Sequence, residues 1–149
     1  MRKPPSQMER TMTLTLTLRL LALGVTLSML GCGANLAPVL APAHVPVVGP
    51  PPGVDGTARV HEAIVRALRS HSWAVVQDAP GVITARVERD KFFAVVDIPY
   101  TAAEYSIVHK ESAPAFKFDG QHIHKHYNNW VRGLSASINA ELLKPIPAA

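Results

Sequence analysis

The chain has 149 residues, enough for one domain, and its 15 lysines and arginines outnumber its 11 acidic residues. Residues 1–31 hold four of those cations and one of the acids, so the rest of the chain carries 11 against 10, a net charge of +1. This nearly even balance of charge does not indicate a nucleic-acid partner, because binding to nucleic acid would require a clustered basic face. Cys32 is the only cysteine, which excludes a disulfide within the chain.

Residues 1–31 have the pattern of an export signal. Four basic residues come before LLALGVTLSML, a run of 11 residues without a charge. The apolar run of a signal peptide has ~7 to 15 residues, whereas a membrane-spanning helix needs ~20. We therefore predict a signal peptide over residues 1–31.

The four residues Met29, Leu30, Gly31 and Cys32 resemble a bacterial lipobox. In proteins with this motif, signal peptidase II cuts before the cysteine, whose thiol receives a diacylglyceryl group. The resemblance implies that Cys32 is lipidated, with acyl chains such as palmitate, and anchors the chain in a membrane. Directly after the cysteine stands Gly33, which resembles the outer-membrane case, because retention in the inner membrane of enteric bacteria is associated with an Asp at that position. We therefore expect the chain at the periplasmic face of the outer membrane.

Residues 32–56 contain six prolines, at positions 38, 42, 46, 50, 51 and 52. Proline at this density prevents helical and ladder hydrogen bonds and favours the extended polyproline II conformation. We therefore expect a semi-rigid tether, which at ~3.1 Å per residue would hold the domain up to about 70 Å from the membrane. The alternative is that the valines of this segment dock on the domain.

Residues 57–144 have the patterns of a folded domain, with 145–149 as a tail. Apolar residues at helical spacing predict helices over 57–70 and about 124–143. The apolar stripe predicted for the second helix consists of Tyr127, Trp130, Val131, Leu134, Ile138 and Leu142. Four β-rich runs separated by turn residues predict strands over 73–78, 82–89, 92–100 and 104–111. This order predicts an α+β fold, a four-stranded antiparallel meander with the N-terminal and C-terminal helices packed on one face.

The third predicted strand is apolar at every position from 92 to 96, so it presents apolar side chains to both faces of the sheet. With the even-numbered residues toward the helices, Phe93 and Val95 point to the uncovered face, where Val108 joins them. An exposed apolar patch often marks a partner-binding surface, and we expect an envelope protein to bind there. The alternatives are a shifted register or a tether that covers this face.

Three segments, SWAVVQDAPGVITARV, AEYSIVHKES and DGQHIHKHYNNWVRGLSASI, resemble a family of small, uncharacterised proteobacterial lipoproteins. The shared pattern is a Trp-led strand, a Tyr-Ser-Ile strand and a closing helix with the residues IHK, YN and WV. The resemblance covers roughly residues 57–144 and implies a periplasmic α+β domain behind a lipid anchor. It implies no reaction, and His122 and His126 lie outside the shared pattern.

His122, His124 and His126 alternate along the segment 119–130. If the segment is extended, the three imidazoles share a face and form a candidate site for zinc or copper. If it is helical, His122 and His126 share a face and His124 points away. The alternative is simply the start of the second helix, with Ile123 in the core and His122 and His126 solvated.

Enzymatic motifs are lacking in the sequence. No serine lies in a nucleophile elbow, the cysteine is assigned to the lipid, and no Gly-rich loop follows a strand to hold phosphate. We therefore predict a lipid-anchored envelope protein that is not an enzyme and acts as an interaction or scaffold module without a cofactor. The competing hypothesis is a metal or small-ligand binder that uses the three histidines to hold zinc or copper.

Overall fold

The structure is a computed structural model that describes residues 35–49 and 52–145. The predicted signal peptide and Cys32 lie outside the described residues. In chain order the elements are β1 (Leu36–Pro38), β2 (Val45–Pro46), α2 (Gly56–Ser70), β3 (Ala74–Ala79), β4 (Val82–Arg89), β5 (Phe92–Pro99), β6 (Glu104–Tyr105), β7 (Val108–Ser112), the 3₁₀ turn η1 (Pro114–Phe116), β8 (His122–His124) and α3 (Lys125–Leu142). Neither helix within the described ranges is both long and apolar enough to cross a membrane.

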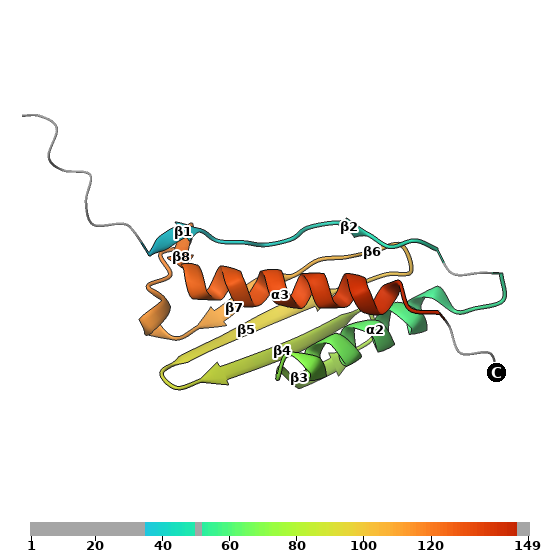
Figure 1. The fold of residues 1–149 in the computed structure, drawn as a ribbon, viewed down its shortest axis with the longest axis horizontal. Helices are drawn as coiled ribbons and strands as arrows, with labels where there is room; N and C mark the ends of the chain where they lie inside the picture. Colours follow the sequence, from blue (N-terminus) through green and yellow to red (C-terminus); the bar gives the residue numbers. More distant parts are fainter. Residues whose placement is uncertain (1–34, 50–51, 146–149) are drawn as a thin grey trace, which may run out of the picture. The chain divides into compact units, whose positions relative to one another are not determined.

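The main sheet has four antiparallel strands in the order β3-β4-β5-β7, and α2 and α3 pack on it (Figure 1). The predicted α+β fold is therefore confirmed. The β3–β4 turn closes with Gly81 at a φ of +81°, a conformation that glycine adopts without steric cost. The fourth predicted strand is divided into the short β6 and the longer β7, with buried Ile107 between them.

Helix α2 begins where the sequence provides a cap. The Asp55 carboxylate accepts the backbone N–H groups of Thr57 at 2.9 Å and Ala58 at 3.2 Å, which would otherwise lack partners at the helix start. One stripe of the helix is buried and consists of Val60, Ala63, Ile64, Ala67 and Leu68. Burial of this stripe against the sheet is the main stabilisation of a helix of this length.

Helix α3 follows the predicted stripe with one exchange. Its buried apolar residues are Tyr127, Val131, Leu134, Ile138 and Leu142. Trp130, which was predicted on this stripe, is only partly buried, whereas Asn128 is 7% exposed. The hydroxyl of Tyr105 donates to Asn139 Oδ1 at 2.9 Å and lies 3.0 Å from Ser135 Oγ, so it ties the middle of α3 to β6.

The described part of the proline-rich segment, residues 35–49, packs on the domain, in contrast to the predicted semi-rigid tether. Residues 35–49 run beside α3, with β1 paired to β8 and β2 paired to β6 (Figure 1). The backbone N–H groups of Val39 and Val47 donate to the carbonyls of Gln121 and Ala103 at 2.8 and 2.7 Å. The alternative of docked valines therefore describes this segment, whose Val39, Leu40, Val45 and Val47 pack against the core.

The prolines do not prevent this docking, because proline lacks only the N–H group. The carbonyl of Pro42 accepts the N–H of Ile107 at 2.8 Å, and the carbonyl of Pro38 accepts the side-chain amide of Asn128 at 2.8 Å. Edge positions tolerate proline when its missing donor would face away from the ladder. A composition that favours polyproline II is thus compatible with a chain fixed at its carbonyl groups.

Candidate functional site

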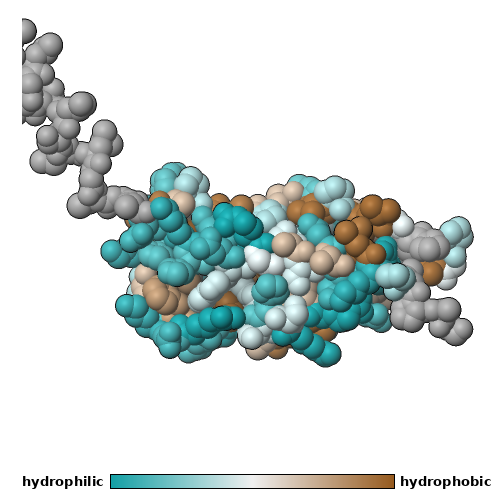
Figure 2. All heavy atoms as spheres, viewed as in Figure 1, coloured by the Kyte–Doolittle hydropathy of each residue, from teal (hydrophilic) through white to brown (hydrophobic). Residues whose placement is uncertain are grey.

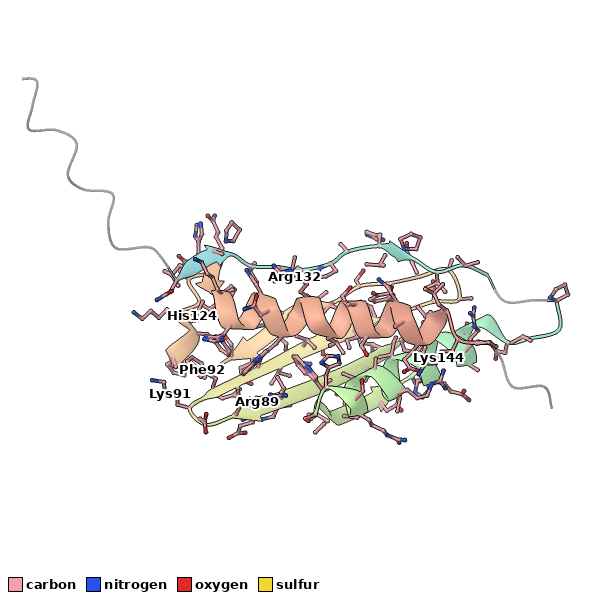
Figure 3. The ribbon with its side chains drawn as sticks, in the orientation of Figure 1. Arg89, Lys91, Phe92, His124, Arg132 and Lys144 are labelled. Atoms are coloured by element: carbon pink, nitrogen blue, oxygen red, sulfur yellow. The ribbon has the colours of Figure 1, made fainter. Side chains whose placement is uncertain are left out.

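One end of the domain gathers the three histidines that the sequence singled out. There β8 pairs with β1 in antiparallel register, which sets Leu36 opposite His124 and Pro38 opposite His122. Lys91, Phe92 and His124 lie together at this end of the ribbon, far from Lys144 (Figure 3). We call this surface the histidine end, and it consists of Lys91, Phe92, Lys117, His122, His124, Lys125 and His126.

His124 organises the start of α3. It is the N-cap residue, and its Nδ1 accepts the backbone N–H of His126 at 3.3 Å. The two imidazoles stack with centroids 5.0 Å apart and planes inclined by 6°. The ring of Phe92 lies about equally far from both, at 6.1 Å from His124 and 6.0 Å from His126. The alternative of a helix start therefore accounts for His124.

The electrostatic surroundings of His124 are positive. Partial burial lowers the pKa of its imidazole, and the nearby positive charges of His126, Lys117 and Lys125 lower this pKa further. Lys117 and Lys125 come from different elements, the residue that ends η1 and the first turn of α3. Hydrophilic side chains cover this end of the molecule, with apolar surface between them (Figure 2).

Asp119 is engaged by its own loop. Its Oδ1 accepts the backbone N–H groups of His122 and Gln121 at 2.6 and 2.8 Å, and these bonds lower the pKa of the carboxyl group. Its other oxygen lies 3.5 Å from Nδ1 of His122. The loop that Asp119 closes positions His122 at the start of β8.

The predicted metal site is not assembled in this structure. Within the described ranges, no group of three or more His, Cys, Asp or Glu side chains is arranged to hold a metal ion. The reason is the change of conformation at His124, where the extended β8 ends and α3 begins, so that His126 continues on the helix. One nitrogen of His124 is also occupied by the N-cap bond.

The predicted partner surface on the sheet is smaller than expected. Val95 is only 7% exposed, and Phe93 is partly buried with the guanidinium carbon of Arg86 4.0 Å from its ring centre. Val108 is 47% exposed. Arg86 reaches across from the neighbouring strand, so the aliphatic stem and charge of this side chain cover apolar surface that the strand pattern alone leaves open.

Beside this face, Asp97 forms a polar cluster. Its Oδ1 accepts the Thr84 hydroxyl at 2.6 Å and lies 3.0 Å from Nζ of Lys110. Burial raises the pKa of Asp97, but the bonds to Thr84 and Lys110 outweigh it, so the pKa lies below the ordinary value. The carboxylate is thus held in its charged form by its partners.

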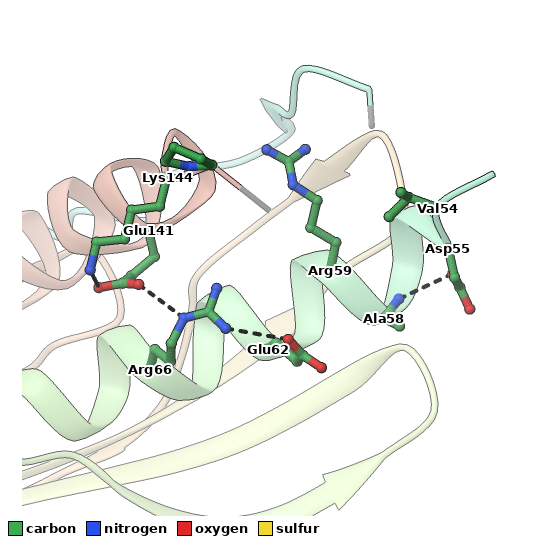
Figure 4. A pocket seen from close by; sticks show the side chains of 9 residues that line it. Val54, Asp55, Ala58, Arg59, Glu62, Arg66, Glu141 and Lys144 are labelled. Carbon is green, nitrogen blue, oxygen red and sulfur yellow. Dashed lines mark hydrogen bonds and ion pairs between the residues drawn. The ribbon is translucent and has the colours of Figure 1, made fainter. Parts of the chain in front are cut away.

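A pocket of about 460 Å³ lies between the start of α2 and the end of α3 (Figure 4). Arg66 crosses it, bonded to Glu141 at 3.0 Å and to Glu62 at 3.3 Å. Lys144 bonds to Glu141 at 2.6 Å, and the bonds from Lys144 and Arg66 lower the pKa of the Glu141 carboxyl group. The charges of this pocket are therefore matched by one another.

His109 and Tyr127 meet beneath the sheet edge. Their ring centroids are 5.2 Å apart, and the ring centroid of Phe118 lies 4.1 Å from that of His109. Nε2 of His109 hydrogen-bonds to Ser112 Oγ at 3.0 Å. Burial raises the pKa of Tyr127, whose hydroxyl is buried and has no partner among the described residues, and burial lowers the pKa of His109.

This depressed pKa predicts a loss of stability in mild acid. The unfolded chain takes up a proton on His109 near the ordinary pKa of 6.5, whereas the folded chain resists it until lower pH. The free energy of unfolding should therefore fall as the pH drops below about 6.5 and level off below the folded pKa. Urea denaturation at several pH values between 8 and 5 gives the free energy of unfolding as a function of pH. This free energy should fall less steeply with decreasing pH in His109→Phe than in the unchanged protein. An equal fall in both proteins would contradict the assignment to His109.

Sequence reasoning missed several residues of the histidine end. Lys91, Lys117 and Lys125 lie in three separate segments of the sequence, and Phe92 was assigned to the core. They meet because the β4–β5 turn, the η1 loop and β8 end on the same side. Asn128, inside the NN pair, was likewise not recognised as the residue that holds Pro38 and Leu40.

No protein-family model, curated protein or solved structure matches the chain.

Proposed function

We propose that this chain is a lipid-anchored protein of the bacterial cell envelope, at the periplasmic face of the outer membrane, whose domain acts as a non-enzymatic interaction module. The position of Cys32 carries the proposal. It ends the lipobox-like MLGC after an uncharged run of 11 residues, and it comes three positions before Asn35, where the described domain begins. The resemblance to small proteobacterial lipoproteins supports the same assignment.

The histidine end is the interaction surface that the geometry favours. Lys91, Lys117, Lys125 and His126 are exposed there, where the imidazoles of His124 and His126 stack beside the tilted ring of Phe92. By contrast, the charges of the pocket between α2 and α3 are matched within the domain, and much of the apolar sheet face is covered. Exposed cations beside aromatic rings suit a partner with negative charge and some apolar surface.

Replacement of Cys32 by alanine tests the anchor. In a bacterium that processes lipoproteins, the Cys32→Ala chain should lose all metabolic labelling by a palmitate analogue and move from the membrane to the soluble periplasmic fraction. Ala34→Ser, two positions further along, is the matched control and should keep both label and location. Labelling that persists in Cys32→Ala would contradict the proposal.

A further inference from the structure

We propose that the histidine end is the membrane-facing surface of the domain and that its cations bind the phosphate groups of anionic lipids. This inference rests on the proposed function, because it takes Cys32 as the point of attachment. It adds an orientation and a partner, namely the lipid surface in which the anchor itself is embedded.

The path along the chain from the anchor at Cys32 to the histidine end is short. The carbonyl of Asn35 accepts the backbone N–H of Lys125 at 2.8 Å, so the start of β1 is joined directly to the histidine end. Cys32 precedes Asn35 by three positions, which an extended chain spans in at most about 11 Å. A lipid on Cys32 therefore keeps Asn35, and the Lys125 backbone bonded to it, close to the membrane surface.

The proline-rich segment does not act as a spacer between the membrane and the domain, because it is bonded to the domain itself. That segment is hydrogen-bonded near its start, middle and end, through Val39, Pro42 and Val47. Asn128 adds bonds to Pro38 and Leu40 at 2.8 and 2.9 Å. A free tether of this length would allow a distance of up to about 70 Å, whereas the fixed segment allows only the three positions before Asn35.

The histidine end presents an excess of positive charge to the lipid. This end carries the cations Lys91, Lys117 and Lys125 against the nearby carboxylates Asp90 and Asp119. Asp119 is already bonded to two backbone N–H groups and lies beside His122. The excess is positive, and the span of at most about 11 Å from Cys32 to Asn35 is comparable to the screening length of about 8–10 Å at ordinary salt.

Exposed apolar surface lies among these cations. Phe118 is 39% exposed in the loop that joins Lys117 to Asp119. Aromatic rings flanked by lysines are well suited to the membrane interface, where the ring enters the headgroup region and the ammonium groups contact phosphate. At the opposite end, Lys144 and Arg66 are paired with acidic partners, so these two cations are neutralised within the domain.

Lysine labelling on vesicles tests the orientation. The lipidated full-length protein is placed in vesicles of phosphatidylcholine alone and in vesicles of phosphatidylcholine and phosphatidylglycerol in equal parts. Its lysines are acetylated with N-hydroxysuccinimide acetate, and the rate at each lysine is read by peptide mass spectrometry. Lys91, Lys117 and Lys125 should react several-fold more slowly on the anionic vesicles, whereas Lys110 and Lys144 should react equally on both.

Two controls sharpen the test. Lys125→Glu should weaken the protection of Lys91 and Lys117, whereas Lys144→Glu, which changes the net charge equally, should not. Salt at about 1 M, where the screening length is about 3 Å, should remove the protection.

The contrary outcomes distinguish an error in the orientation from an error in the anchor. Equal labelling on both kinds of vesicle, or protection spread equally over all five lysines, would overturn the orientation while leaving the lipid anchor intact. A chain that stays with neither kind of vesicle would overturn the anchor and the orientation with it.

Discussion

Replacement of Phe116 by alanine should lower the free energy of unfolding by about 3–5 kcal/mol, the range for a large aromatic residue deleted from a core. Phe116 is fully buried in η1, and its ring centroid lies 4.8 Å from that of Phe92 and 5.2 Å from that of Trp130. The ring therefore fills the space where β5, η1 and α3 meet, and its removal leaves a cavity beneath the histidine end.

Urea denaturation followed by circular dichroism measures this loss. Phe118→Ala is the matched control, because Phe118 is only two positions away but 39% exposed, and it should lose less than about 1 kcal/mol. If the two variants were equally stable, η1 would not be the support of this end.

Replacement of Asn128 by alanine should lower the free energy of unfolding by about 2–3 kcal/mol. The side chain is 7% exposed, accepts the N–H of Leu40 at 2.9 Å and donates to the carbonyl of Pro38 at 2.8 Å. Alanine would leave both backbone groups without a partner, and an unsatisfied buried polar group costs about 1–3 kcal/mol.

The neighbouring asparagine is the control for this variant. Asn129 is exposed and accepts a bond from Arg132 at 2.8 Å, so Asn129→Ala should change stability by less than about 0.5 kcal/mol. Thermal melting of both variants separates the two positions. Equal melting temperatures would mean that Asn128 does not hold the proline-rich segment.

The sequence predicted the main sheet and both helices because their signals are local. Alternation of Ile83, Ala85 and Val87 with polar residues repeats along one strand, and all three are buried. The Asp55 cap stands directly before its helix. Periodicity and capping of this kind are visible within one window of sequence, which is why the boundaries of these predicted elements differ from the structure by at most one residue outside the divided fourth strand.

The place of the proline-rich segment was not predictable in the same way. It depends on bonds between residues that lie far apart in sequence, such as Leu40 and Asn128, which are 88 positions apart. Neither residue belongs to a periodic pattern that would reveal the contact. The cations and rings of the histidine end come together for the same reason, since the β4–β5 turn lies on the same side of the fold as the later segment from η1 to the start of α3.

The attachment of residues 35–49 determines where an anchored domain would lie, and amide hydrogen exchange tests it most directly. In the lipidated protein, the N–H groups of Val39, Leu40, Val47 and Ile107 should exchange on the order of tenfold or more slowly than in an unfolded chain, because each is bonded within the domain. Exchange of all four at the unfolded-chain rate, with the amides of α3 still protected, would contradict the account and restore a free tether.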